Sequence, residues 1–600
     1  MIENVNQCFD AASAGCYTFT AQPDARRFHL IDERVWMRLP GDALESSAIR
    51  DASYSAIQAS GASHLMNTMT TGSIRRLLTT FLILFLIISL VAAYVQIFNQ
   101  AFFNGPVLAH SEHDRRNCPP YDAPLRGTIF DRNGVKLAWT VQDPKSQPCG
   151  YRRQYDPRVA SSGLAPLLGY YSTQYGTAGV ENAFNDALAG VQHGETVNDI
   201  TDKLLHRPRH GQDIRLTIDI NLQVEASNAF DSAYLSSNIV SACQPAGSHP
   251  PGSMVVEDPH SGEILAMVSK PSYDPNQIDN KGYFQQLQAD PGLPLLDRAA
   301  QGLYVPGSVF KTTTLLASLD SGTSTLDTTY TKDEALHFVA NGEPINWDDY
   351  ITFHQWQSGR FVANFPMPLI DGYAYSDNVI FAREAVNTGA DKWLSYLRKY
   401  GIATPGTQVA PIPFDAPYKQ SSAYNAIGSD GQPQDFNINL LAESGFGQGQ
   451  LLISPLTMSV ITSSVANDGM LVTPHVLLGG DTSSQQVISP NAAAGVRKAM
   501  WAVVDHGTGA TYPNPTGGPQ LLDSPAQMGG KSGTGQGDEP NPQSWWISLA
   551  PDDQYPNGGG PAKMAITVMK EHSGDGGCQA WVANATYNYA INHKIGPFGG

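Results

Sequence analysis

The chain has 600 residues, a formal net charge of −18 and 41% hydrophobic residues. This length exceeds that of one ordinary domain, so two or three folded units are expected, and the hydrophobic content excludes a disordered or collagen-like chain. The acidic balance argues against a nucleic-acid partner, because phosphate-binding surfaces are basic.

Residues 1–73 precede a long apolar run and are predicted to form a cytoplasmic tail. Residues 1–65 are polar, contain no lysine and show no sustained periodicity. Two interpretations stay open for this segment. Either Met66 or Met69 is the true start and residues 1–65 carry no function, or the segment is a tail without stable structure.

Residues 74–98 are predicted to be a membrane anchor. The 22 residues of 77–98 carry no charge, and as a helix they would span about 33 Å, against a hydrocarbon core of about 30 Å. Arg75 and Arg76 precede the run, which places the amino end inside and all later residues outside. We therefore expect a single-pass protein of the cell membrane; a cleaved signal peptide is the alternative, with a poor cleavage site at Ala92-Ala93.

Residues 99–244 are predicted to form a separate domain. Asn133-Gly134 is a strong turn signal between two strand-like runs within 124–138. Residues 178–190 have apolar side chains at helical spacing, and residues 213–230 have the pattern of a strand that passes into a helix.

A break rich in proline and glycine at 244–253 marks the boundary of a second domain over residues 245–600. Residues 254–269 form a predicted hairpin, and two further strands are expected at 543–551 and 562–570, followed by a terminal helix. A sheet built from both ends of a domain, with helices between them, is an α+β arrangement.

Ser308 and Lys311 form a Ser-x-x-Lys motif. Ser308 follows Pro306 and Gly307, so it is expected at the start of a helix, where residues three apart share one face. The helix start favours negative charge on a developing oxyanion. A lysine in a desolvated or cationic pocket is able to take the proton of a serine nucleophile.

Two further motifs follow in the chain. Ser376-Asp377-Asn378 is a Ser-x-Asn triplet, and Lys531-Ser532-Gly533 precedes a predicted strand. A strand edge with a glycine allows close approach of a substrate backbone. Each motif alone is weak. Their order (Ser-x-x-Lys, Ser-x-Asn, Lys-Ser/Thr-Gly) is that of penicillin-binding proteins and serine β-lactamases.

Together with longer segments, these motifs resemble class B penicillin-binding proteins over residues 126 to about 590. RGTIFDRNG (126–134) and AGVENAFNDALAG (178–190) are similar to segments of the family's non-catalytic domain. The segments similar to its transpeptidase domain are 257–276, 295–311, 442–459 and 466–476. Two departures are small: Asp297 stands where asparagine is usual, and Ser532 where threonine is commoner.

The resemblance implies a serine β-lactamase/transpeptidase-like fold, a central antiparallel sheet flanked by helices, preceded by an elongated dimerisation or pedestal-type domain and one transmembrane helix. It also implies a peptidoglycan D,D-transpeptidase. In that reading, Ser308 attacks the penultimate D-alanine of a stem peptide, and Lys311 is the base. The remaining site residues would be Ser376, Asn378 and Lys531 in catalysis, and Ser532, Gly533 and Thr534 in substrate binding.

The same resemblance implies no metal and no cofactor. The expected partners are peptidoglycan stem peptides, β-lactam antibiotics, the membrane, a polytopic glycosyltransferase and other division or elongation proteins. Cys118 and Cys149 flank one region and are able to pair. Because the first and last strands of the family's sheet are neighbours, a Cys243–Cys578 disulfide is also expected.

Alternative functions differ in what they require. A class A protein would need a glycosyltransferase with a Glu-Asp pair, which residues 99–245 lack. A β-lactamase would need a deacylating glutamate, and only Glu384 and Glu443 lie between 379 and 530. A D,D-carboxypeptidase shares the acyl-enzyme chemistry and stays open. A non-enzymatic scaffold would need a damaged site, whereas all motif residues are present.

Overall fold

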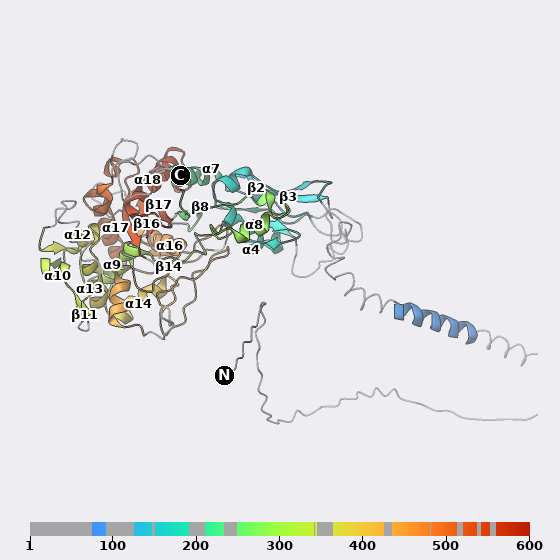
Figure 1. The fold of residues 1–600 in the computed structure, drawn as a ribbon, viewed down its shortest axis with the longest axis horizontal. Helices are drawn as coiled ribbons and strands as arrows, with labels where there is room; N and C mark the ends of the chain where they lie inside the picture. The colour runs from blue at the N-terminus through green and yellow to red at the C-terminus, as the bar shows by residue number, and fades with distance from the viewer. Residues whose placement is uncertain are drawn as a thin grey trace, which may run out of the picture. The chain divides into compact units, whose positions relative to one another are not determined.

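The computed structural model describes residues 75–91, 125–146, 150–190, 210–232, 249–340, 343–344, 364–424, 435–480, 482–512, 520–536, 542–551 and 560–599. The chain forms two compact units, residues 1–100 and 101–600, which are described separately. In the first unit, residues 75–91 are helical (Figure 1). None of the helices within these described ranges has the length and apolar character needed to cross a membrane, and residues 74 and 92–98 of the predicted anchor lie outside them.

The second unit is built around a five-stranded antiparallel sheet in the order β15-β16-β17-β7-β8. The strands are β15 (Gly529–Gly535), β16 (Gln543–Ala550), β17 (Met564–Lys570), β7 (Gly252–Glu257) and β8 (Ile264–Lys270). The predicted hairpin is β7–β8, and the two predicted late strands are β16 and β17. Because β17 pairs with β7, the end of the chain is joined to the start of the catalytic domain.

Helices cover both faces of this sheet (Figure 1). They are α16 (Pro455–Ala466) and α17 (Pro490–Asp505) on one face, and α7 (Ile220–Ser232) and α18 (Ala580–Asn592) on the other. Glu257 of β7 accepts a 2.6 Å hydrogen bond from Ser459 of α16. On the opposite face, the hydroxyls of Ser548 on β16 and Tyr587 on α18 lie 3.2 Å apart. The α+β prediction is therefore confirmed.

Most of the described elements between β8 and β15 are helices, with irregular segments between them. The helices are η1 (Pro275–Gln277), α8 (Tyr283–Ala289), η2 (Gly307–Phe310), α9 (Lys311–Asp320), α10 (Lys332–Leu336), α12 (Leu369–Ala374), α13 (Asn378–Thr388), α14 (Ala390–Lys399), α15 (Ile438–Gly445), η3 (Thr508–Thr511) and η4 (Leu521–Asp523). Three short antiparallel pairs lie among them: β9 (Thr329–Tyr330) with β12 (Met367–Pro368), β10 (Val339–Ala340) with β11 (Glu343–Pro344), and β13 (Met470–Val472) with β14 (Ser484–Gln486). After β17 come η5 (Gly576–Gln579), α18 and η6 (Gly596–Phe598).

The non-catalytic part contains a four-stranded sheet in the order β3-β2-β1-β6. Its elements are β1 (Ile129–Phe130), β2 (Lys136–Gln142), β3 (Tyr151–Tyr155), β6 (Ile214–Arg215), the pair β4 (Tyr171–Ser172) and β5 (Gly176–Thr177), and the helices α2 (Pro157–Ser161), α3 (Ala165–Leu168), α4 (Gly179–Ala183) and α5 (Asn185–Leu188). The predicted Asn133-Gly134 turn joins β1 to β2, with Gly134 at φ +83°.

The helix predicted over 178–190 is two short helices instead. Phe184 adopts φ −106° and ψ 25° and separates α4 from α5. The apolar spacing nevertheless predicts the buried face, since Val180 and Leu188 are both buried. Spacing alone does not detect a break that keeps both ends on the same apolar face.

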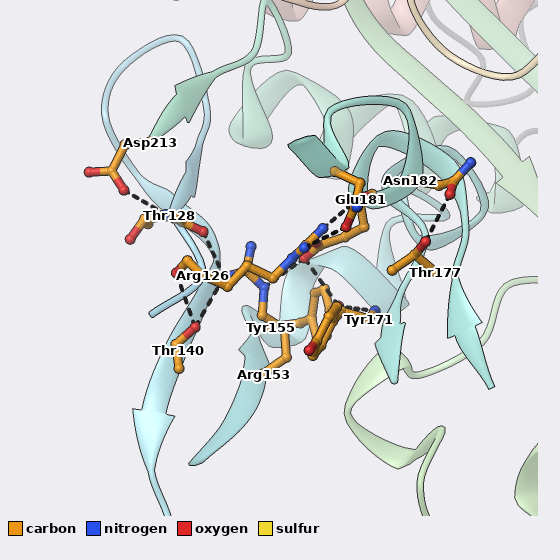
Figure 2. Close-up of polar contacts among 12 residues, drawn as sticks. Arg126, Thr128, Thr140, Arg153, Tyr155, Tyr171, Thr177, Glu181, Asn182 and Asp213 are labelled. Carbon is orange, nitrogen blue, oxygen red and sulfur yellow. Dashed lines mark hydrogen bonds and ion pairs between the residues drawn. The ribbon is translucent and has the colours of Figure 1, made fainter. Parts of the chain in front are cut away.

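A buried ion network fastens α4 to the sheet of the non-catalytic part, as Figure 2 shows. The Glu181 carboxylate accepts 2.6 Å bonds from the Nε atoms of both Arg126 and Arg153. Arg126 Nη2 also donates to the Glu181 carbonyl, at 2.6 Å, and the Tyr155 hydroxyl lies 3.2 Å from the Glu181 carboxylate. The carboxylate is inaccessible to solvent, so its burial is offset by two charged partners.

The non-catalytic part shares a hydrophobic core with the β7–β8 hairpin. Ile129 and Leu167 belong to the same buried cluster as Val255 of β7 and Met267 of β8. The neighbouring Met254 and Val256 belong to the larger catalytic core instead. This hairpin is therefore buried on both faces, which explains its continuous apolar sequence.

Cys578, in η5, is disulfide-bonded. Cys243, its predicted partner, lies outside the described residues, as do Cys118 and Cys149. Both predicted disulfides therefore stay predictions.

Candidate active site

Ser308 lies in the single turn of η2, which leads directly into α9. The turn is held from two sides through Gly307, which adopts φ +58°. Its N–H donates to the Gly447 carbonyl at 2.9 Å, and a Cβ on this residue would lie 2.4 Å from the Thr534 carbonyl oxygen. A residue without a side chain is therefore required immediately before the serine.

Lys311 is the first residue of α9 and its side chain is buried. Its Nζ lies 3.0 Å from Ser308 Oγ and 2.7 Å from the Ser376 carbonyl oxygen. Asn378 Oδ1 also accepts a hydrogen bond from this amine. The structure thus brings Ser308, Lys311 and Asn378 together. The helical spacing predicts the first two residues, and the family resemblance implies the third.

Ser376 occupies a strained turn between α12 and α13, with φ +65°. Asp377 stabilises this turn because its Oδ1 caps α13 by accepting the Ile380 N–H at 2.8 Å. Ser376 Oγ lies 3.2 Å from Lys311 Nζ and 2.8 Å from Lys531 Nζ. One hydroxyl therefore bridges two amines.

Lys531 lies on β15 and is fully buried. Burial, and next the nearby positive charge of Lys311, hold the pKa of the Lys531 amine well below its usual range. Its Nζ also donates to the Ser532 carbonyl at 3.0 Å. Perturbed amines of this kind are typical of sites that transfer protons.

β15 is the edge strand of the sheet, so one side of its backbone faces the site. Gly533 lies against the Ser308 turn, where a Cβ would come within 2.8 Å of Val309 N. Thr534 is partly exposed, and the Ser532 hydroxyl lies 2.8 Å from that of Thr508. The strand therefore offers N–H groups and hydroxyls beside Ser308.

Two contacts of the site were not predicted. Thr508, in η3, bonds to Ser532, and Gln448 Nε2 donates to the Thr534 carbonyl at 3.3 Å. Gln448 lies within a segment already similar to the family, and Thr508 stands between two glycines after a long helix. Neither signal identifies the strand that the side chain reaches.

Asp297, which stands where the family usually has asparagine, lies in a buried turn. Its Oδ1 accepts the N–H groups of Ala299 and Ala300, at 3.1 and 3.4 Å. Burial raises the pKa of this carboxyl to about 6, although both N–H groups oppose that rise. Within the described part of the chain, no three His, Cys, Asp or Glu residues are placed to hold a metal.

Comparisons with known proteins agree with this geometry. Residues 252–584 match the model of the penicillin binding protein transpeptidase domain, and residues 126–214 match that of the penicillin binding protein A dimerisation domain. The peptidoglycan D,D-transpeptidase PbpA of Mycolicibacterium smegmatis is 26% identical over 435 residues, covering 68% of this chain and 78% of the relative. The peptidoglycan D,D-transpeptidase MrdA of Escherichia coli is 26% identical over 439 residues, covering 64% and 62%.

Among solved structures, penicillin-binding protein A of M. tuberculosis as an imipenem acyl-enzyme complex superposes with a TM-score of 0.60 at 24% identity, covering 78% of this chain and 98% of that one. At this identity the likeness shows the fold. The family model spans more than half of the chain and includes all three motifs. The chain therefore belongs to the penicillin-binding proteins with a transpeptidase domain, and within them to class B.

Proposed function

We propose that this protein is a peptidoglycan D,D-transpeptidase that acts through an acyl-enzyme on Ser308. The observation that carries the proposal is the continuous path from Ser308 Oγ through Lys311 Nζ and Ser376 Oγ to Lys531 Nζ, with separations of 3.0, 3.2 and 2.8 Å. The names of the PbpA and MrdA relatives support the same activity.

In the first half of the reaction, Ser308 Oγ attacks the carbonyl carbon of the penultimate D-alanine while Lys311 takes the hydroxyl proton. The N–H groups of Ser308 and Thr534 receive the oxyanion. The C–N bond then breaks, and Ser376 and Lys531 pass a proton to the departing D-alanine amine. The product is an ester between the stem peptide and Ser308.

In the second half, the amine of a neighbouring stem peptide attacks the ester carbon. The C–O bond to Ser308 breaks, and the proton released by the amine returns to the serine oxygen. In the first half, Lys531 with the side chains of Ser532 and Thr534 binds the terminal carboxylate of the donor peptide, and this carboxylate has left with D-alanine before the amine attacks. The acceptor alone separates this reaction from that of a D,D-carboxypeptidase, in which water takes the place of the amine.

A β-lactamase activity is disfavoured by the contacts of Glu384, one of the two candidate glutamates. Glu384 is buried and accepts hydrogen bonds from the hydroxyls of Ser318, Ser324 and Tyr330. It is engaged within the core and does not contact the Ser308 turn in the described contacts. Glu443 is half-buried, and burial raises the pKa of its carboxyl.

The anchor is a further part of the proposal. We propose that residues 74–98 hold the protein in the cell membrane with the catalytic domain outside the cytoplasm. The uncharged run at 77–98 and the arginines before it support this. A polytopic glycosyltransferase and other division or elongation proteins are the partners that such an anchored transpeptidase needs. Protease accessibility of residues 252–584 in intact cells tests the orientation.

Labelling with a fluorescent penicillin tests the activity. We expect a covalent adduct with the wild-type protein and none with Ser308→Ala. No adduct with either protein would overturn the enzyme proposal and leave a scaffold. An adduct that survives Ser308→Ala would overturn the proposed acyl-enzyme on Ser308. With a donor pentapeptide and an amine acceptor, a cross-linked product supports transpeptidation, whereas free tetrapeptide alone indicates a carboxypeptidase.

A further inference from the structure

His506 immediately follows α17, and both nitrogens of its ring face carboxylates. Nε2 lies 3.1 Å from Asp371 Oδ1, and Nδ1 lies 2.8 Å from Asp505 Oδ2. A carboxylate only accepts hydrogen bonds, so both contacts are satisfied only when each ring nitrogen carries a hydrogen. The hydrogen bond to Asp371 raises the pKa of His506 most, while partial burial opposes the rise and Asp505 adds to it.

The ring joins the Ser376 turn to the end of α17. Asp371 belongs to α12, which ends just before Tyr375 and Ser376. The Tyr375 ring is buried and meets His506 edge to face, with centroids 5.9 Å apart and planes at 74°. The backbones of Gly507 and Ala374 also lie close together, because a Cβ on Gly507 would lie 2.3 Å from the Ala374 carbonyl oxygen.

The residues that follow His506 contact β15. Thr508 lies two residues after His506, and its hydroxyl meets that of Ser532 at 2.8 Å. A displacement at residue 506 therefore reaches two parts of the site. These are the turn whose Ser376 bridges both lysines and the segment that contacts the Lys-Ser-Gly strand.

We propose that His506 is a positioning residue, whose charged ring clamps the Ser376 turn to the Thr508 segment and so keeps Ser376 Oγ within reach of Lys311 and Lys531. This inference rests on the proposed function and extends it to a residue outside the three motifs. His506 has no described contact with Ser308, Lys311 or Lys531, so it acts through Asp371 and Tyr375.

The titratable groups around the ring limit how its charge responds to pH. Asp371 and Tyr375 face it from α12 and the turn that follows, and Asp505 faces it from α17. Lys531, on the neighbouring β15, bonds to Ser376 and Ser532, and the Tyr373 hydroxyl bonds to Thr312. When His506 loses a proton at alkaline pH, one ring nitrogen confronts a carboxylate without a hydrogen between them, and the clamp weakens.

The test measures the second-order rate of acylation by a fluorescent penicillin from pH 6 to pH 10, with the full chain in detergent. We expect His506→Gln to acylate roughly ten- to a hundredfold more slowly at pH 7, because small displacements of catalytic groups have effects of this size. His506→Arg, which stays charged, should recover much of the rate. The acylation rate of the wild type, divided by that of His506→Arg, should fall as the histidine deprotonates with rising pH. Asp371→Asn removes the carboxylate that raises the pKa of His506 most, so in its presence the same fall should occur at lower pH.

His593→Gln is the matched control, since His593 follows another helix, is exposed and contacts only Tyr589 of that helix in the described contacts, through a 2.9 Å bond to its carbonyl and a stacked ring. It should leave the rate profile unchanged. If His506→Gln has the melting temperature of the wild type and the same dependence of acylation rate on pH, the inference is overturned. Labelling of Ser308, and with it the proposed function, would still stand. A rate loss that only follows the folded fraction, without recovery by arginine, would also overturn it. If the wild-type protein forms no Ser308 adduct, the proposed function fails first.

Discussion

Thr508 Oγ1 lies 2.8 Å from Ser532 Oγ, although the two residues belong to different elements, η3 and β15. Ser532 has a proposed role in binding the substrate carboxylate. We expect Thr508→Val to slow acylation by roughly five- to tenfold, the effect of one lost hydrogen bond that orients a binding group. Thr508→Ser keeps the hydroxyl and is the control. Equal acylation rates for the valine and serine variants would show that the bond has no role.

Alanine variants of Gly307 and Gly322 distinguish the cost of a strained backbone from the cost of a steric clash. Gly307 and Gly322 both have positive φ, +58° and +70°, but a Cβ at Gly322 meets nothing within 4 Å. Alanine costs about 1–2 kcal/mol of conformational energy at either position. Only Gly307→Ala should also push the Ser308 turn away from Thr534, and we expect it to lose acylation by more than about a hundredfold. Similar rates for the two variants would contradict this.

Glu181→Ala should destabilise the non-catalytic part strongly. The substitution leaves the buried guanidinium groups of Arg126 and Arg153 without their carboxylate, which costs roughly 3–5 kcal/mol when a buried pair is broken. Asp186→Ala, in the next short helix and exposed, is the matched control. Thermal unfolding followed by circular dichroism measures both variants. A melting temperature of Glu181→Ala equal to that of the control would refute the argument.

Glu257 should make stability depend on pH. Burial raises the pKa of its carboxyl to about 7, against the lowering effect of the hydrogen bond from Ser459. Between about pH 4.5 and 7 the folded chain keeps a proton that the unfolded chain has released, so this group's contribution to stability falls as pH rises. Below that range both states are protonated, and the contribution is fully present.

Glu257→Gln does not ionise and should escape this loss. Relative to wild type, its stability should rise by about 2.5 kcal/mol between pH 5 and pH 8, from a difference of about 2.5 in pKa. The measurement is the difference in melting temperature between variant and wild type at the two pH values. A difference that stays constant would mean that Glu257 titrates normally.

The disulfide of Cys578 offers a direct check on the sequence-based pairing. Cys578 is bonded, and we expect its partner to be Cys243. Mass spectrometry of a non-reduced digest should find these two cysteines in one linked peptide pair. A link from Cys578 to Cys118 or Cys149 would disprove the prediction.

The three motifs could be predicted because each is local. Ser308 and Lys311 are one helical turn apart, and Lys531 stands two residues before Gly533, so sequence spacing already indicates which side chains share a face. Their order along the chain then identified the site. The hairpin and the two late strands were equally accessible, because each is a short apolar run bounded by turn residues.

The remaining features depend on contacts between distant segments. Nothing near His506 indicates that Asp371 lies opposite its ring, and nothing near Thr508 indicates Ser532. Phe184 is apolar at the correct spacing, yet the backbone breaks there. Such features follow from tertiary packing, and one sequence does not encode them as a local pattern.

The pairing of Gly252 with Lys570 has a consequence for how the protein is made. The nucleophile is translated more than two hundred residues before the strand that forms the opposite wall of its groove. A nascent or truncated chain that ends before residue 529 would carry Ser308 and Lys311 but neither β15 nor its Lys531 amine. Reactivity toward penicillin should therefore report that synthesis has run almost to the last helix.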